Sequence, residues 1–119
     1  MPVANNEQKV LVIDRQRWLR GSPTDSFLLR ESDEKMCCLG FDALAWGLKQ
    51  DYIKGVGEPI EVEALDDGRK YIHRARRKSD AIEAAIRIND DPNLGDTDRE
   101  AHLVPVLKQL GWDDVQFIN

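Results

Sequence analysis

Residues that build reactive sites are scarce in this chain of 119 residues, which has only two cysteines and two histidines. The cysteines are neighbours, Cys37 and Cys38, and a disulfide between them would be strained and would close no useful loop. We therefore predict two free thiols in a reducing compartment. The Cys-x-x-Cys and His-x-x-x-His spacings of zinc sites are absent, so we expect no metal site and no other cofactor.

Long apolar runs and familiar catalytic motifs are also missing. No run approaches the roughly 20 residues needed to cross a bilayer, and residues 1–9 lack the features of a signal peptide. We therefore expect no membrane association and a cytoplasmic location. The sequence has neither a phosphate-binding glycine loop nor a nucleophile elbow, so neither of those sites is predicted.

Negative charge is in excess, because 22 Asp and Glu outnumber 17 Lys and Arg and leave a net charge of −5. This balance disfavours general affinity for nucleic acid. Residues 69–78 are the exception, since they carry six positive charges and no negative one. A helical segment here could present a basic face to an acidic protein, a phosphate or nucleic acid, with Tyr71 available for stacking. The alternative is a solvated helix face that neighbouring carboxylates partly neutralise.

The chain is 41% hydrophobic and 33% charged, which is typical of a globular domain. We expect a flexible N-terminus over residues 1–8 and a single α+β domain over residues 9–119. Branched apolar residues predict strands at 9–14 and 113–118, and a short extended segment at 27–30. The expected fold is a small antiparallel sheet with the terminal strands adjacent, packed by a buried central helix and two C-terminal helices.

The most apolar segment runs from Cys37 to Leu48, and its periodicity predicts the buried central helix. Asp42 is its only charged residue, and Gly40 would allow another backbone to approach closely. Ser32 or Asp33 could cap the start of this helix.

Two more helices are predicted at 79–88 and 97–110. Thr97 and Glu100 have capping-box spacing, and Pro105 should bend the second helix or mark its first turn. Residues 60–65 could be a strand or irregular.

Cys37 and Cys38 are weak candidates for catalysis. They lie where the central helix begins, and the helix dipole there would stabilise a thiolate. His73 or His102 could supply a base, and residues 89–91 an orienting group. However, free cysteine is also a common core residue, and no proximity between these groups is visible in the sequence. We therefore assign no catalytic residue.

Several short segments, in their order and spacing, resemble those of a known group of proteins. Together they extend over most of the chain outside residues 52–78. The segments are Trp18-Leu19-Arg20-Gly21, Lys35-Met36-Cys37-Cys38-Leu39-Gly40-Phe41, Ile88-Asn89-Asp90-Asp91-Pro92, Asp98-Arg99-Glu100-Ala101 and Val115-Gln116-Phe117. The set resembles a group of small proteins encoded by tailed bacteriophages and prophages. The resemblance implies an origin, with the host cytoplasm as location, but no activity and no functional residues.

Small phage proteins often act by binding and blocking a host protein, which is an argument by analogy. We hypothesise a non-enzymatic module that binds and modulates or inhibits a host or defence protein, with self-association left open. The predicted partner-binding residues are those of the basic segment: Arg69, Lys70, Tyr71, Arg74, Arg76, Arg77 and Lys78. Charge reversal at Arg74, Arg76 and Arg77 should weaken binding without unfolding. The alternatives are a cysteine-dependent enzyme using Cys37 or Cys38, and a nucleic-acid or nucleotide binder using residues 69–78.

Overall fold

The structure is a computed structural model that describes residues 8–63 and 67–119. In these residues the two predicted terminal strands form the only sheet. Strand β1 is Val10–Asp14 and strand β2 is Asp114–Ile118. Their side chains alternate, so that Leu11, Ile13 and Val115 are buried while Val12 and Ile118 are exposed. The predicted flexibility of residues 1–7 and the predicted structure of residues 64–66 fall outside the described residues.

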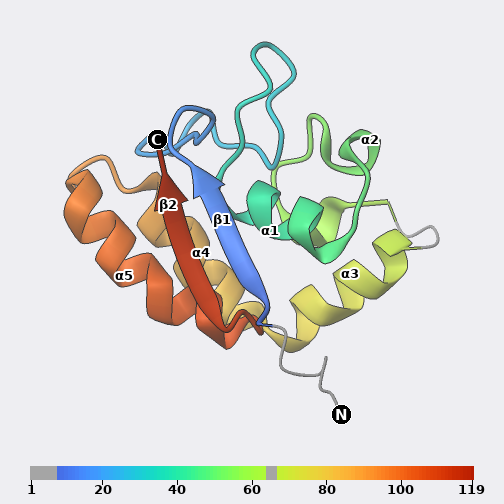
Figure 1. Cartoon of the computed structure of the whole chain (residues 1–119). Coiled ribbons are helices and arrows are strands. Elements are labelled where there is room, and N and C mark those ends of the chain that lie inside the picture. The colour runs from blue at the N-terminus through green and yellow to red at the C-terminus, as the bar shows by residue number, and fades with distance from the viewer. Residues whose placement is uncertain (1–7, 64–66) are drawn as a thin grey trace.

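The two strands are parallel, and the antiparallel sheet that we predicted is wrong. Val10 is opposite Asp114, and Ile13 is opposite Phe117. Helix α5, Asp96–Gln109, runs along the sheet, and the chain turns at Gly111 into β2, which returns in the opposite direction (Figure 1). Parallel neighbours require a long crossover connection, and the helices between β1 and β2 supply it. The mixed α+β class itself is confirmed.

The central helix α1, Cys38–Trp46, is buried as predicted over its first six residues. A Cβ atom at Gly40 would collide with the backbone carbonyl of Leu28, which confirms the predicted close approach. Gly47, with φ 117°, ends the helix. Residues 27–30 form no strand. Leu29 instead makes an isolated bridge to Lys54, just beyond the short helix α2, Gln50–Ile53.

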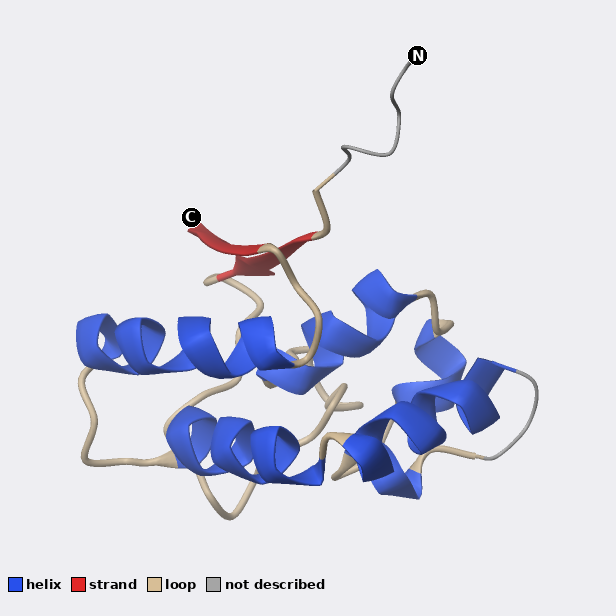
Figure 2. Ribbon diagram, turned by 90° about the horizontal axis from the view of Figure 1, so that it is seen from below, coloured by secondary structure: helices blue, strands red, loops and turns tan. Residues whose placement is uncertain are grey.

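Three further helices complete the described part of the fold. They are α3, Asp67–Arg77, α4, Ser79–Asp90, and α5, and the 3₁₀ helix η2, Pro59–Glu61, packs against α3. Helices α4 and α5 lie side by side, and the two strands pack on α1 and α5, with α4 on the opposite side of α5 (Figure 2). In the described residues no helix has the length and apolar character that a bilayer crossing requires.

Pro105 does not mark the first turn of α5, because the helix begins at Asp96 and continues through this residue. The missing N–H of Pro105 leaves the exposed carbonyl of Ala101, one turn earlier in α5, without that helical hydrogen bond. Gly95 stands at the N-cap of α5 without a side-chain hydrogen bond, so the capping box of Thr97 and Glu100 is not formed. Glu100 instead accepts from the Arg15 side chain, at 2.7 and 2.8 Å, and ties α5 to the segment after β1. This ion pair competes successfully with the cap for the same carboxylate.

Candidate functional site

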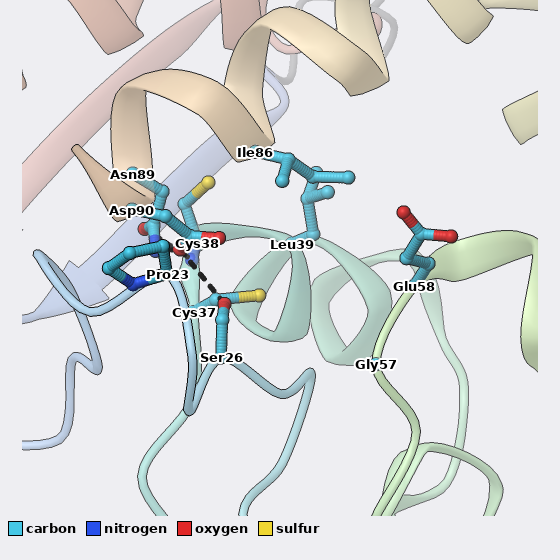
Figure 3. Close-up of a pocket in the computed structure, with 10 residues that line it drawn as sticks. All are labelled: Pro23, Ser26, Cys37, Cys38, Leu39, Gly57, Glu58, Ile86, Asn89 and Asp90. Carbon is cyan, nitrogen blue, oxygen red and sulfur yellow. Dashed lines mark hydrogen bonds between the residues drawn. The ribbon is translucent and has the colours of Figure 1, made fainter.

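Both cysteines lie in the wall of a cavity of about 220 Å³ at the start of α1 (Figure 3). The other lining residues are Pro23, Ser26, Leu39, Gly57, Glu58, Ile86, Asn89 and Asp90. The Cys37 side chain is 4% exposed and Cys38 is not exposed at all. Burial raises the pKa of Cys37 to about 12 and also raises the pKa of Cys38. Both thiols are therefore protonated at neutral pH, which makes them poor nucleophiles.

The cavity does not bring a catalytic base to either thiol. His73 on α3 and His102 on α5 are exposed and neither lines the cavity. Asp90 faces the cavity, but its carboxylate accepts from the Ser26 hydroxyl at 2.9 Å and from the Asn89 amide at 2.8 Å. The structure therefore places residue 90 near the thiols, as hypothesised, without the histidine that the cysteine chemistry would need.

Asn89 at the end of α4 is a buried junction, 1% exposed, between three distant segments. Its Oδ1 atom accepts from the indole N–H of Trp18 at 2.8 Å and from the backbone N–H of Cys38 at 3.0 Å. Its amide nitrogen donates to the Leu19 carbonyl at 3.0 Å. Asn89 thereby caps α1 from outside the helix, and the predicted caps Ser32 and Asp33 are wrong, because α1 begins only at Cys38.

Arg99 at the start of α5 extends the same network and is 3% exposed. One of its terminal nitrogens, Nη1, donates to the carbonyls of Ile88, Asn89 and Asp91 at 2.9–3.0 Å. These carbonyls belong to the C-terminal end of α4, where cationic donors are favoured. The Nε atom of Arg99 lacks a hydrogen bond but lies 3.6 Å from a carboxylate oxygen of Asp96.

Four of the short segments singled out in the sequence therefore meet in one place. Trp18, Cys38, Asn89 and Arg99 each come from a different resemblance segment, and hydrogen bonds connect them. The two hubs of this network, Asn89 and Arg99, are nearly inaccessible to solvent, and all their side-chain polar atoms except Arg99 Nε are hydrogen-bonded within the fold. These segments thus have a structural role.

A second buried polar junction surrounds Asp42, the single charged residue of α1, which is completely buried. Arg74 donates to both carboxylate oxygens at 2.9 Å, Tyr71 donates its hydroxyl at 2.9 Å and Trp112 its indole N–H at 2.7 Å. Burial raises the pKa of Tyr71, and the charge of Asp42 raises it further. Burial lowers the pKa of Arg74, but the hydrogen bond and charge of Asp42 outweigh this effect. The junction joins α1, α3 and the turn before β2.

These contacts correct the predicted binding set in the basic segment. Tyr71 is fully buried and the Arg74 side chain is 13% exposed in its pair with Asp42, so both belong to the core. Reversal of the charge at Arg74 would place two like charges together in the interior, so we now expect it to destabilise the fold. The exposed cations are Arg69, Lys70, Arg76, Arg77 and Lys78, which we call the α3 basic face.

Beside the α3 basic face is a hollow of about 260 Å³ that is lined by both apolar and basic residues. The lining residues are Ile60, Val62, Arg69, Ile72, His73 and Arg76. Ile60 was not predicted as a surface feature, although it follows a proline and alternates with charged residues in the sequence. In the described residues no group of three or more His, Cys, Asp or Glu side chains could hold a metal ion.

Comparisons with protein-family models, with curated proteins and with solved structures found no match to this chain. The geometry of the described residues is therefore the basis of the functional argument that follows.

Proposed function

We propose that this protein is a non-enzymatic binding module that attaches to an acidic surface of a host or defence protein through the α3 basic face and thereby modulates or inhibits it. The observation that carries the proposal is how the charges of α3 divide. Arg74 turns inward to Asp42, whereas Arg69, Lys70, Arg76 and Arg77 are exposed on the same helix.

Four of the five exposed cations differ in pairing from other arginines of the chain. Arg15, Arg20 and Arg30 each pair with a carboxylate of a neighbouring segment. In the described residues, by contrast, Lys70, Arg76, Arg77 and Lys78 form no ion pair. Cations without carboxylate partners inside the molecule are available to carboxylates of another one, and such complementarity raises the association rate and selects partners.

The charge distribution also orients the encounter. Residues 69–78 carry six positive charges, so the net charge of −5 leaves −11 for the rest of the chain. An acidic partner is therefore repelled from most of the surface and attracted to one helix. The rigid attachment of α3 through Tyr71 and Arg74 holds this helix in place, which limits the entropy lost on binding.

The alternatives have weaker support. The buried, protonated thiols lack a nearby histidine, which argues against a cysteine-dependent enzyme. Tyr71, the aromatic residue of the basic segment, is buried and cannot stack on a base, so a nucleic-acid binder would depend on cations alone.

Affinity capture from a host lysate tests the proposal. The variant R76E/R77E reverses two exposed charges and leaves the pair of Arg74 with Asp42 intact. We expect it to fold normally and to lose the partner protein that the unaltered chain retains, in a manner that weakens with added salt.

The matched control is R17E/K49E, which reverses two exposed charges on other segments. It should retain the partner. Equal capture by the unaltered chain and by R76E/R77E would overturn the proposal, and capture that a nuclease treatment removes would favour a nucleic-acid binder instead.

A further inference from the structure

Ile60 projects from η2 and is the most exposed large apolar residue of the described chain, at 53%. It lies in a short turn that is fixed by two contacts: Pro59 is buried, and Glu58 and Glu61 form a capping box around η2. An exposed apolar side chain on a fixed turn loses little entropy when a partner covers it. Single exposed apolar residues are common, so the surroundings of Ile60 decide what it can bind.

Ile60 stands between two hollows that follow α3 and α4. The first, of about 260 Å³, has Val62 and Ile72 in its wall, with Arg69 and Arg76 beside them. The second, of about 130 Å³, also includes Ile60, and its other lining residues are Glu58, Pro59, Ala75, Ser79, Ile82, Glu83 and Ile86. Both hollows thus combine apolar walls with charged residues, and Ile60 is common to them.

The charges in the two hollows have opposite sign. Arg69 and Arg76 line the first hollow, whereas Glu58 and Glu83 line the second. A ligand that carries carboxylates is attracted to the first hollow and repelled from the second. The continuation of the α3 basic face through Lys70 and Arg77 strengthens the same preference. Charge complementarity therefore selects an anionic ligand, and the apolar walls select one that also has an apolar side chain.

We infer that the first hollow is the binding site for an acidic peptide segment of the partner protein, which places an apolar side chain against Ile60, Val62 and Ile72 and a carboxylate on Arg76. This inference rests on the proposed function and specifies the chemistry of the partner. Binding of this kind joins a desolvated apolar anchor to a charged rim, which is how linear segments obtain both affinity and specificity.

The test uses fluorescent peptides and the full-length chain in an anisotropy titration. One short peptide alternates Glu and Leu, a second alternates Glu and Ala, and a third alternates Lys and Leu. We expect the Glu/Leu peptide to bind best, and the variant I60S to weaken it about tenfold, as loss of a central apolar contact does. The matched control I118S alters the exposed Ile118 of β2, which is 42% exposed, and should bind as the unaltered chain does.

Two results would overturn the inference, and each has a different meaning for the proposed function. Suppose that the Glu/Leu and Glu/Ala peptides bind equally, that I60S binds as the unaltered chain does, and that R76E/R77E binds poorly. This result would exclude an apolar binding site at Ile60 and would still support binding by the α3 basic face. If no acidic peptide binds, or if a single-stranded oligonucleotide binds more tightly than the Glu/Leu peptide, the peptide segment is excluded as ligand. Lysate capture with R76E/R77E then decides separately whether the α3 basic face binds a folded partner.

Discussion

Both oxygens of the buried Asp42 carboxylate accept hydrogen bonds from the guanidinium group of Arg74, at 2.9 Å each. The two residues are 32 positions apart and fix the position of α3 on α1. This pair explains why a helix with so many cations can be docked on an apolar core. Arg74 pairs with the buried carboxylate of Asp42, and the other cations of α3 are exposed to solvent.

The substitution R74M should destabilise the protein by about 3–5 kcal/mol, because it leaves a buried carboxylate without its counter-charge. The measurement is a urea unfolding curve at neutral pH. The matched control R77M removes an exposed cation of the same helix and should change the free energy of unfolding by less than about 0.5 kcal/mol. Similar unfolding midpoints for the two variants would mean that the pair is not the internal support of α3.

The substitution N89A should cost about 3 kcal/mol, because it deprives the Trp18 indole and the Cys38 backbone N–H of their shared acceptor. The loss should also shift the tryptophan fluorescence, since Trp18 is 3% exposed and hydrogen-bonded to this residue. Asn93 in the turn after α4 is exposed and serves as control. N93A should unfold at the same urea concentration as the unaltered protein. If N89A does so too, the network that joins the resemblance segments contributes nothing to stability.

The substitution G40A should cost about 3 kcal/mol or more, since its Cβ atom would meet the carbonyl group of Leu28, which is backbone and cannot turn aside. Gly95 at the N-cap of α5 has open space at its Cβ position, and its φ of −71° suits any residue. G95A should therefore lose only about 0.5–1 kcal/mol, which is the ordinary cost of alanine at an N-cap. Thermal unfolding of both variants measures the difference, and equal losses would contradict the close approach of α1 to Leu28.

Both thiols should resist labelling by a maleimide or disulfide reagent in the native protein. They are buried and their pKa values are raised, so a reactive thiolate forms only when the structure opens. The labelling rate should follow the unfolding equilibrium as urea is added. Rapid labelling of the native chain below pH 8 would instead support the cysteine-dependent enzyme.

The raised pKa of Cys37 also predicts how stability depends on pH. The folded chain keeps the proton up to about pH 12, while the unfolded chain loses it near the ordinary pKa of 9.0. The stabilising contribution is therefore complete below pH 9 and is lost as the pH rises toward 12. The variant C37A should show a smaller loss of stability between pH 9 and pH 11 than the unaltered protein, and identical slopes would contradict the raised pKa.

Local sequence patterns were sufficient for most of the secondary structure. The runs of branched apolar residues at the two ends form β1 and β2, and the periodic segments form α1, α4 and α5. The close approach of another backbone at Gly40 was also predictable, because a glycine inside an apolar helix indicates such an approach. These features depend on residues a few positions apart, whose spacing determines which side of an element is apolar.

The tertiary structure alone decided the direction of the strands and the role of the polar residues. The crossover between β1 and β2 is long enough for either direction, so the path of α5 and the turn at Gly111 determine that they are parallel. Asp42 was visible as the one charge in an apolar helix, but its partner Arg74 lies in a segment that reads as a uniform basic stretch.

The sequence suggested Asn89 only as a possible orienting group for the thiols, because its partner Trp18 is 71 residues away. A buried polar group has to find its hydrogen-bond partners wherever the packed chain supplies them, and no local pattern records that choice. The sequence therefore determined the elements and the surplus of charge at residues 69–78. Only the packing decided that Arg74 pairs with the buried Asp42 and that the other cations of this segment are exposed to solvent.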